Sequence, residues 1–303
     1  MSVELHILGS SSASPTGDRS QSGQILDINK LRVLIDCGEG TQYKLIRGNL
    51  SYQKIDIILI SHLHGDHYLG LFGLLNTMSF NHRTRPLHVY SPGGLKELID
   101  HHFRVSNTTL RYDLIVHEIL GGEELIYDEG NIEMHAVPVQ HRVPCYAYLI
   151  REKTVNRKLN IDVCEKYGVS QENFKALKRG EDLTLEDGSV LSNELLTFDP
   201  EPPFSYAYVT DTIYLEELAR RFSGVQVLYH EATFLDNLMD RAEMTYHSTA
   251  AQAARFASKA LVNQLIIGHF SSRYDDLQPH LEEARALFPN TELAEEGRSF
   301  FFK

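Results

Sequence analysis

Four side chains able to coordinate a metal ion fall within six positions of the segment ISHLHGDHYLG, residues 60–70. Alternate residues of an extended segment face the same way, so His62 and His64 can reach one ion. A turn after His64 can direct Asp66 and His67 to a neighbouring point. Imidazole nitrogen and carboxylate oxygen suit zinc. The spacing predicts a metal site, and two ions about 3.5–4 Å apart would use these donors more naturally than one.

A lone histidine beside an apolar segment is more often a hydrogen-bonded or half-exposed side chain than a ligand. We interpret seven histidines in that way: His82, His88, His101, His102, His117, His135 and His280. The cluster at residues 62–67 differs because no Lys or Arg lies nearby to pair with it. Unpaired polar groups are costly to bury, and a bound cation would offset that cost.

Three further donors stand where predicted strands end. They are His141 after strand 132–137, Asp211 after strand 206–210 and His269 at the end of strand 264–269. Functional sites gather at such strand ends in layered folds. Together with the first cluster, these donors predict a set of seven ligands.

The apolar pattern predicts strands and helices in both halves of the chain. The predicted strands are 3–8, 31–36, 55–60, 87–90, 132–137, 146–150, 206–210, 225–230 and 264–269. The predicted helices are 68–80, 94–103, 247–260 and 279–288. This order indicates two sheets with helices outside, in an α/β or α+β layered domain.

Composition narrows the protein class. The 303 residues are 42% hydrophobic and 23% charged, as in globular proteins, and no run reaches the ~18 apolar residues of a membrane span. The start of the chain does not resemble a signal peptide. The three cysteines form no CxxC pair, so we expect reduced thiols and a cytoplasmic location. A net charge of −12 argues against a protein whose whole surface binds nucleic acid.

One polar segment, residues 151–197, interrupts the strand-rich halves. Residues 151–181 hold eight Lys/Arg and five Asp/Glu, a local balance of +3. The simple interpretation is a solvated surface insertion. The alternative is a functional insertion, because long insertions in compact domains often bind something.

The motif HLHGDHYLG (62–70) matches HxHxDHxxG of the metallo-β-lactamase superfamily. DCGEGTQ (36–42), HEATF (230–234) and HSTAAQAA (247–254) resemble motifs of the ribonuclease Z family, endonucleases that trim the 3′ end of precursor tRNA. The resemblance covers nearly the whole chain. It implies a four-layer αβ/βα sandwich, an α+β fold, as one domain over residues 1–303 with an inserted tRNA-binding arm at 151–197.

The resemblance also implies two zinc ions per subunit. It assigns one zinc to His62, His64, His141 and Asp211, and the other to Asp66, His67, Asp211 and His269, with Asp211 bridging. A β-lactamase of this fold usually has Cys in place of Asp211, so phosphodiester chemistry is favoured. The expected product ends are a 3′-hydroxyl on the tRNA and a 5′-phosphate on the trailer, after attack by a water activated between the zinc ions.

The family assigns Asp66 a second role, accepting the proton of that water. Imidazolium is suited to protonating a leaving oxygen near pH 7, and His247 at the start of a predicted helix is the candidate. Glu231 would orient His247 and raise its pKa. The simpler alternatives are a helix-capping polar residue for His247 and an ordinary buried acid for Glu231.

The expected partners are precursor tRNA, contacted by the arm, and a second copy of the chain, because the family's enzymes are homodimers. The arm departs from the family pattern, since EKYGVSQENFKALKRG (165–180) lacks the usual Gly-Pro pair. Two other functions are left open. One is another hydrolase of the same fold, such as a phosphodiesterase acting on small or cyclic nucleotides or a small-ester hydrolase. The other is a non-catalytic RNA-binding module with structural zinc.

Overall fold

Two mixed sheets form the framework of the first of two units into which the chain divides. The computed structural model describes residues 3–153, 156–185, 187–200 and 202–302. The first unit joins residues 1–150 to residues 205–303, and the second spans Arg151–Phe204. Each unit has its own hydrophobic core, and the segment at 151–204 interrupts the first unit in the sequence.

Each of these two sheets has seven strands within the described ranges. The first follows the order β20, β1, β3, β4, β5, β6, β7, with bounds Ser299–Phe302, Val3–Gly9, Gly23–Ile28, Leu31–Cys37, Ile57–Leu59, Leu87–Pro92 and Leu114–Ile119. The second follows the order β19, β17, β16, β15, β10, β9, β8, with bounds Thr291–Leu293, Gln264–Gly268, Val227–Glu231, Ser205–Val209, Cys145–Glu152, Ile132–Val139 and Glu124–Glu129. β4 to β7 run parallel, as do β15, β16, β17 and β19.

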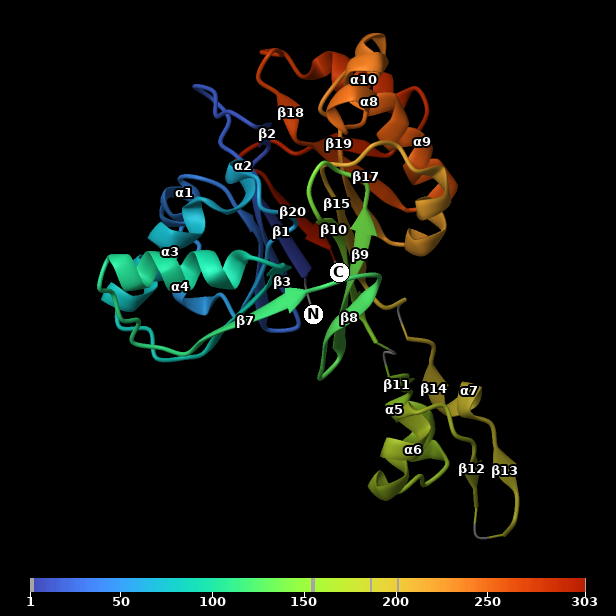
Figure 1. Ribbon diagram of the computed structural model, residues 1–303. Coiled ribbons are helices and arrows are strands. Elements are labelled where there is room, and N and C mark those ends of the chain that lie inside the picture. Colours follow the sequence, from blue (N-terminus) through green and yellow to red (C-terminus); the bar gives the residue numbers. More distant parts are fainter. Residues whose placement is uncertain (1–2, 154–155, 186, 201, 303) are drawn as a thin grey trace. The chain divides into compact units, whose positions relative to one another are not determined.

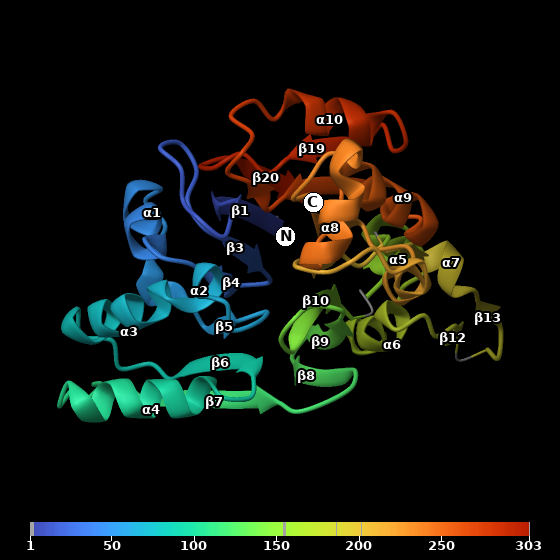
Figure 2. The same ribbon diagram turned by 45° about the horizontal axis from the view of Figure 1, so that its top comes forward.

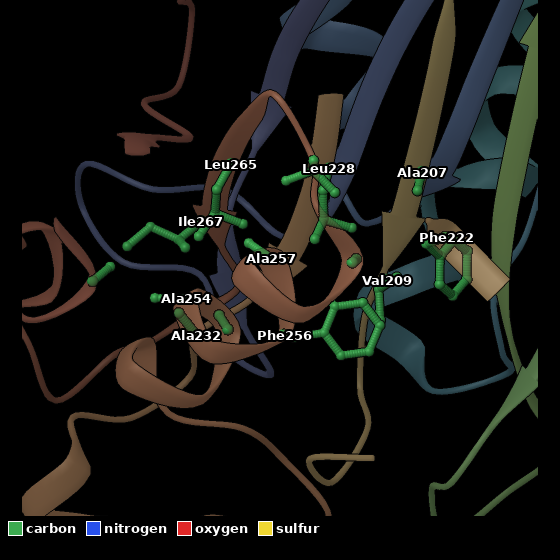
Figure 3. Packing of buried hydrophobic residues seen from close by; sticks show 14 of the residues in the cluster. Ala207, Val209, Phe222, Leu228, Ala232, Ala254, Phe256, Ala257, Leu265 and Ile267 are labelled. Atoms are coloured by element: carbon green, nitrogen blue, oxygen red, sulfur yellow. The ribbon is translucent and has the colours of Figure 1, made fainter. Parts of the chain in front are cut away.

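Helices cover the outer faces of both sheets (Figures 1 and 2). On the first sheet these are α1 Thr41–Arg47, α3 Gly70–Phe80 and α4 Leu95–Val105. On the second they are α9 Ala250–Ala260, α10 Gln278–Arg285 and the 3₁₀ helix η3 Glu216–Phe222. Figure 3 shows Phe222 and Phe256 packed with Leu228 and Ile267 in the second of these cores. The predicted α+β sandwich is therefore confirmed.

Buried tyrosines join the inner faces of the two sheets. The hydroxyl of Tyr206 donates to Gln24 Oε1 at 2.5 Å, and that of Tyr208 donates to Asp36 Oδ2 at 2.8 Å. A third, on Tyr148, donates to the carbonyl of Ile60 at 2.6 Å. A buried hydroxyl without a partner is costly, so these bonds favour one register of the two sheets.

The remaining elements are short and connect these layers. In the first unit they are β2 Ser11–Ser12, β18 Phe270–Ser271, α2 Gly65–Tyr68, α8 Met239–Thr245, η1 Tyr52–Lys54 and η4 Asp236–Leu238. β2 pairs with β18, Ser11 opposite Phe270. In the described ranges, no helix is long and apolar enough to cross a bilayer.

The second unit, Arg151–Phe204, has a small core made by Cys164, Leu177, Leu183 and Leu196. Its elements are β11 Lys158–Leu159, α5 Ile161–Lys166, η2 Gln171–Asn173, α6 Phe174–Lys178, β12 Leu183–Thr184, β13 Val190–Leu191, α7 Asn193–Leu196 and β14 Thr197–Phe198. β11 pairs with β14 and β12 with β13. The predicted segment 151–197 lies inside this unit, which extends to residue 204.

Several sequence-based boundaries shift in the structure. The predicted helix 247–260 begins only at Ala250, because Thr249 forms a capping box with Gln252. His247 therefore precedes the helix, and the prediction that it opens the helix was wrong. The strands β3, β7, β8 and β20 and the helix α1 were not predicted. β7 and β8 carry exposed and half-buried residues throughout most of their length, so their apolar pattern is weak.

Two glycines of α3 provide a matched test of packing. A Cβ on Gly70 would lie 2.0 Å from the carbonyl oxygen of Gly38, whereas one on Gly73 would meet nothing closer than the Gln42 side chain at 3.5 Å. We expect Gly70→Ala to lower the free energy of unfolding by about 1–3 kcal/mol or more, since backbone must shift. Gly73→Ala should raise it by up to about 1 kcal/mol. Urea denaturation measures both, and equal effects would contradict the close approach.

Candidate active site

The seven predicted ligands lie together, each near the end of a strand. His62 and His64 follow β5, and Asp66 and His67 lie in α2. The other three follow strands of the second sheet: His141 after β9, Asp211 after β15 and His269 after β17. Parallel neighbouring strands end at the same edge of a sheet. The layered fold thus brings residues from distant parts of the sequence to one place.

Four of these residues form a first donor set: His62, His64, His141 and Asp211. His64 Nδ1 lies 3.0 Å from His62 Nε2 and 3.1 Å from His141 Nε2. Asp211 Oδ2 lies 3.5 Å from His62 Nε2 and 3.7 Å from His141 Nε2.

A second donor set consists of Asp66, His67, His269 and again Asp211. His67 Nε2 lies 3.2 Å from His269 Nε2 and 3.3 Å from Asp66 Oδ2. Asp211 Oδ1 lies 3.1 Å from His269 Nε2 and 3.4 Å from His67 Nε2. The two oxygens of Asp211 therefore face different sets.

The spacing of the donors fits a cation in each set. Zinc binds nitrogen and oxygen at about 2.0–2.1 Å in a tetrahedron, which separates neighbouring donors by about 3.4 Å. The donor–donor distances given above run from 3.0 Å to 3.7 Å. Two imidazole nitrogens whose lone pairs face each other repel one another unless a proton or a cation lies between them. The residues present fit two metal ions.

A buried carboxylate behind the second set orients His67. His67 Nδ1 donates to Asp36 Oδ2 at 2.7 Å, and Asp36 also accepts from the backbone N–H and hydroxyl of Ser61 and from Tyr208. The proton on Nδ1 leaves Nε2 as a lone pair for the set, as a hydrogen-bonded outer carboxylate does for a metal-binding histidine. The sequence pattern gave Asp36 no role of its own; a carboxylate directly after the apolar run of β4 was the available signal.

The first set has an analogous support at His141, whose Nδ1 donates to the carbonyl of Tyr246 at 3.1 Å. Tyr246 has φ 61°, and positive φ values recur at Asp36 (56°), Asp211 (44°) and His269 (59°). Such left-handed conformations are unfavourable for residues with a side chain and often occur at functional sites. Here the strained residues are the donors or their direct supports.

Glu231 and His247 form an ion pair beside both sets. His247 Nδ1 lies 2.9 Å from Glu231 Oε1, and the fully buried Glu231 also accepts the backbone N–H of Thr212 at 2.9 Å. The ring of His247 lies 5.4 Å from those of His141 and His269. The predicted pair is thus present, and it is held before α9 by the backbone N–H of His247, which donates to the carbonyl of Ala242.

The two charges of this pair stabilise one another. Burial by itself would lower the pKa of His247, but the Glu231 carboxylate raises that pKa to about 9. Burial would raise the pKa of Glu231, and His247 holds it below its ordinary value. The imidazole is therefore protonated near neutral pH and can donate a proton.

His280 differs from its expected role as a satisfied or half-exposed histidine. It is fully buried, and neither ring nitrogen has a hydrogen-bond partner among the described residues. Its ring lies 4.5 Å from that of Tyr274 and 5.2 Å from that of Phe270. Burial lowers its pKa to about 4, so it packs as a neutral aromatic ring.

Solved structures identify the class of protein first. The crystal structure of human tRNase Z, short form, matches with a TM-score of 0.72 at 24% identity, covering 98% of each chain. The metallo-β-lactamase fold protein YhfI from Bacillus subtilis matches with a TM-score of 0.71 at 17% identity, covering 99% of each chain. The sandwich is therefore the metallo-β-lactamase fold, as the motif at 62–70 predicted.

Sequence relatives give the family. Ribonuclease Z of Bacteroides fragilis is 42% identical over 295 residues, 97% of each chain, and that of Cytophaga hutchinsonii is 44% identical over 304 residues, 99% of this chain and 96% of that one. The chain belongs to the ribonuclease Z family, which confirms a hydrolase of the endoribonuclease class. A family model described as Anti-Pycsar protein Apyc1 also matches residues 3–156. That match ends before Asp211, His247 and His269.

Replacing Glu231 tests the ion pair. In Glu231→Gln the carboxylate is lost and the burial remains, so the pKa of His247 should fall below its wild-type value of about 9. Because the folded-state pKa of His247 is raised above 6.5, its charge contributes full stability below pH 6.5 while Glu231 stays ionised. This contribution disappears as the pH rises through about 9. The stability difference between wild type and variant should shrink over that range.

NMR titration of the His247 ring and denaturation at several pH values measure these changes. Glu216→Gln, which removes an exposed acid paired with Lys259, is the control and should leave the His247 titration unchanged. An unchanged His247 pKa in Glu231→Gln would contradict the pair.

Proposed function

We propose that the protein is a zinc-dependent endoribonuclease that removes the 3′ trailer from precursor tRNA. The observation that carries this proposal is the pair of donor sets joined through Asp211, with the Glu231–His247 pair beside them. When bound, two cations would lower the pKa of a water molecule and neutralise charge on the phosphate under attack. The names of the relatives support tRNA as the substrate.

Asp66 would accept the proton of the attacking water. Its Oδ2 belongs to the second donor set and accepts the backbone N–H of Ala13 at 2.8 Å, which leaves Oδ1 for the proton. Burial would raise the pKa of Asp66, but His67 and His269 hold it well below its ordinary value. The carboxylate is therefore ionised and available as an acceptor.

His247 would protonate the leaving oxygen. Its Nδ1 is engaged by Glu231, so Nε2 carries the proton that can be delivered. As the new P–O bond forms on the water oxygen, the bond from phosphorus to O3′ breaks, and O3′ takes the proton from Nε2. This assignment yields a 3′-hydroxyl on the tRNA and a 5′-phosphate on the trailer.

The segment 151–204 is our candidate for the tRNA-binding arm. Its basic residues are not in overall excess: residues 151–204 hold eight Lys/Arg and eleven Asp/Glu. Arg157 pairs with Asp199 and Arg179 with Glu181. Lysines on α5 and α6, namely Lys166, Lys175 and Lys178, are exposed and would contact phosphates. Such contacts give an affinity that falls as salt rises, with recognition by RNA shape.

We also propose a homodimer, formed through one side of α1 and α3. Tyr43, Ile46, Leu69 and Phe80 are 63%, 57%, 49% and 74% exposed. Leu69, the N-cap of α3, and Phe80, its last residue, are eleven residues apart and so lie within about 20° of one another around the helix axis. Thr77 of α3 donates to Gln42 of α1, which links the two helices. Apolar side chains gathered on a surface favour association, and a symmetric dimer would use the same face twice.

We also propose that the protein is cytoplasmic. Cys37, Cys145 and Cys164 are buried free thiols, which suits a reducing compartment.

The central test incubates purified protein with a precursor tRNA, with and without a chelator, and maps both product ends. Cleavage should require metal and leave the ends named above. Asp66→Ala should abolish cleavage yet largely retain tRNA affinity, whereas His247→Gln should slow cleavage by about 10²–10⁴-fold without changing metal content. Metal-independent cleavage, or products carrying a 3′-phosphate, would contradict the proposed function.

Removing the arm separates this function from a phosphodiesterase acting on small or cyclic nucleotides. Glu152 and Phe204 bond to one another, N–H to carbonyl at 2.8 Å and N–H to carboxylate at 2.9 Å. Residues 153–203 can therefore be replaced by a short Gly-Ser linker. Precursor tRNA cleavage at low substrate should fall at least about tenfold as phosphate contacts are lost. Hydrolysis of a small chromogenic phosphodiester should not change. If precursor tRNA is still cleaved at the wild-type rate, the segment is not the tRNA-binding arm.

Charge substitution tests the dimer. Ile46→Asp with Phe80→Asp should yield monomers, since four charges would be buried in a two-fold interface, as measured by analytical ultracentrifugation. Leu120→Asp, at a side chain that is 82% exposed elsewhere, is the matched control. A variant that sediments like wild type would place the contact on another face.

A further inference from the structure

Thr233, between the Glu231–His247 pair and the second donor set, is a buried side chain without an assigned role. Its hydroxyl lies 2.6 Å from Glu231 Oε2 and 3.0 Å from His269 Nδ1. It also lies 2.9 Å from the carbonyl oxygen of His269. The residue is 2% exposed. One oxygen thus contacts both the candidate acid–base pair and a candidate metal ligand.

Counting protons fixes the direction of these bonds. A hydroxyl has one proton to donate and two lone pairs to accept. The four neighbours of the Thr233 hydroxyl include His269 Nδ1 and, farther away at 3.4 Å, His247 Nδ1. The other two, the Glu231 carboxylate and the His269 carbonyl, can only accept. The proton must go to one of them, and the carboxylate is closer and makes the stronger, charge-assisted bond. A lone pair then faces His269 Nδ1, so Nδ1 must carry the proton.

We infer that Thr233 is a positioning residue that fixes His269 in the tautomer with a proton on Nδ1 and a lone pair on Nε2. Nε2 is the atom that faces Asp66, His67 and Asp211 in the second donor set. Asp36 does the same for His67 through a direct carboxylate contact. His269 instead receives its orientation through a hydroxyl, and this inference rests on the two-metal centre proposed above.

Glu231 acquires two separate tasks from this arrangement. Its Oε1 accepts from His247 and from the backbone N–H of Thr212, while its Oε2 accepts from Thr233. One carboxylate therefore holds the proton donor and, through Thr233, sets the lone pair of a ligand. Substitutions at Thr233 should separate the two tasks, because they leave Oε1 and its contacts in place.

Thr233→Val removes the hydroxyl and keeps the β-branched shape. We expect the affinity of one of the two metal equivalents to fall about 10–100-fold, as for other lost outer-sphere partners of metal-binding histidines, and the first donor set to be unaffected. Thr233→Ser keeps the hydroxyl and should bind both equivalents as wild type does. Thr233→Ala lacks the hydroxyl without adding bulk, and replaces the valine variant if that one fails to fold.

The experiment titrates metal-free protein with Zn²⁺ against a competing chelator, and ¹⁵N NMR of the His269 ring reads its tautomer before metal is added. The expected result is an Nδ1–H ring in wild type and Thr233→Ser, and a mixture of tautomers with one weakened equivalent in the variants without a hydroxyl. Two tight equivalents and an Nδ1–H ring in those variants would overturn the role of Thr233. A wild type that takes up no Zn²⁺ would instead overturn the proposed centre.

Discussion

Asp211 presents its two carboxylate oxygens to two different groups of donors, and the arrangement of the site depends on that sharing. Oδ2 faces His62 and His141, while Oδ1 faces His67 and His269. A carboxylate at 3% exposure is costly to bury alone, and so is a group of imidazoles. Around bound cations, as proposed, these groups would offset one another, which would account for the strained backbone at Asp211, with φ 44°.

The layers of the fold supply the geometry that this sharing needs. Candidate ligands follow β5 of the first sheet, and others follow β15 and β17 of the second. The distances between donors therefore depend on how the two sheets are set against each other. Tyr208 fixes this setting where it matters most, because its hydroxyl reaches across to Asp36, which in turn orients His67. The bond from Tyr208, which joins the sheets, and the bond from His67 thus meet at the same carboxylate, that of Asp36.

Sequence patterns predicted the parts of this site that are local. The HxHxDH spacing places four donors on one strand end and turn, and Asp211 and His269 follow apolar runs that read clearly as buried strands. Asp36 and Thr233 were not predicted to act, because their partners are set by tertiary packing. Asp36 meets Tyr208 across 172 residues of sequence, and Thr233 meets His269 across 36. Helix capping was missed although the sequence carries its signal. Thr249 and Gln252 in HSTAAQAA have the spacing of a capping box, which already indicated Thr249 as the N-cap of α9.

The two hydrogen bonds between Glu152 and Phe204, near the two ends of the segment 151–204, have a consequence for how the chain folds. The larger unit must close a gap of about fifty residues between β10 and β15, and closing a flexible loop costs more entropy as it lengthens. A segment that collapses early around its own small core would hold Glu152 and Phe204 together and so present the gap as a nearly closed one. During synthesis, the inserted segment would then bring β15 close to β10, which is made earlier, and so help the two strands pair.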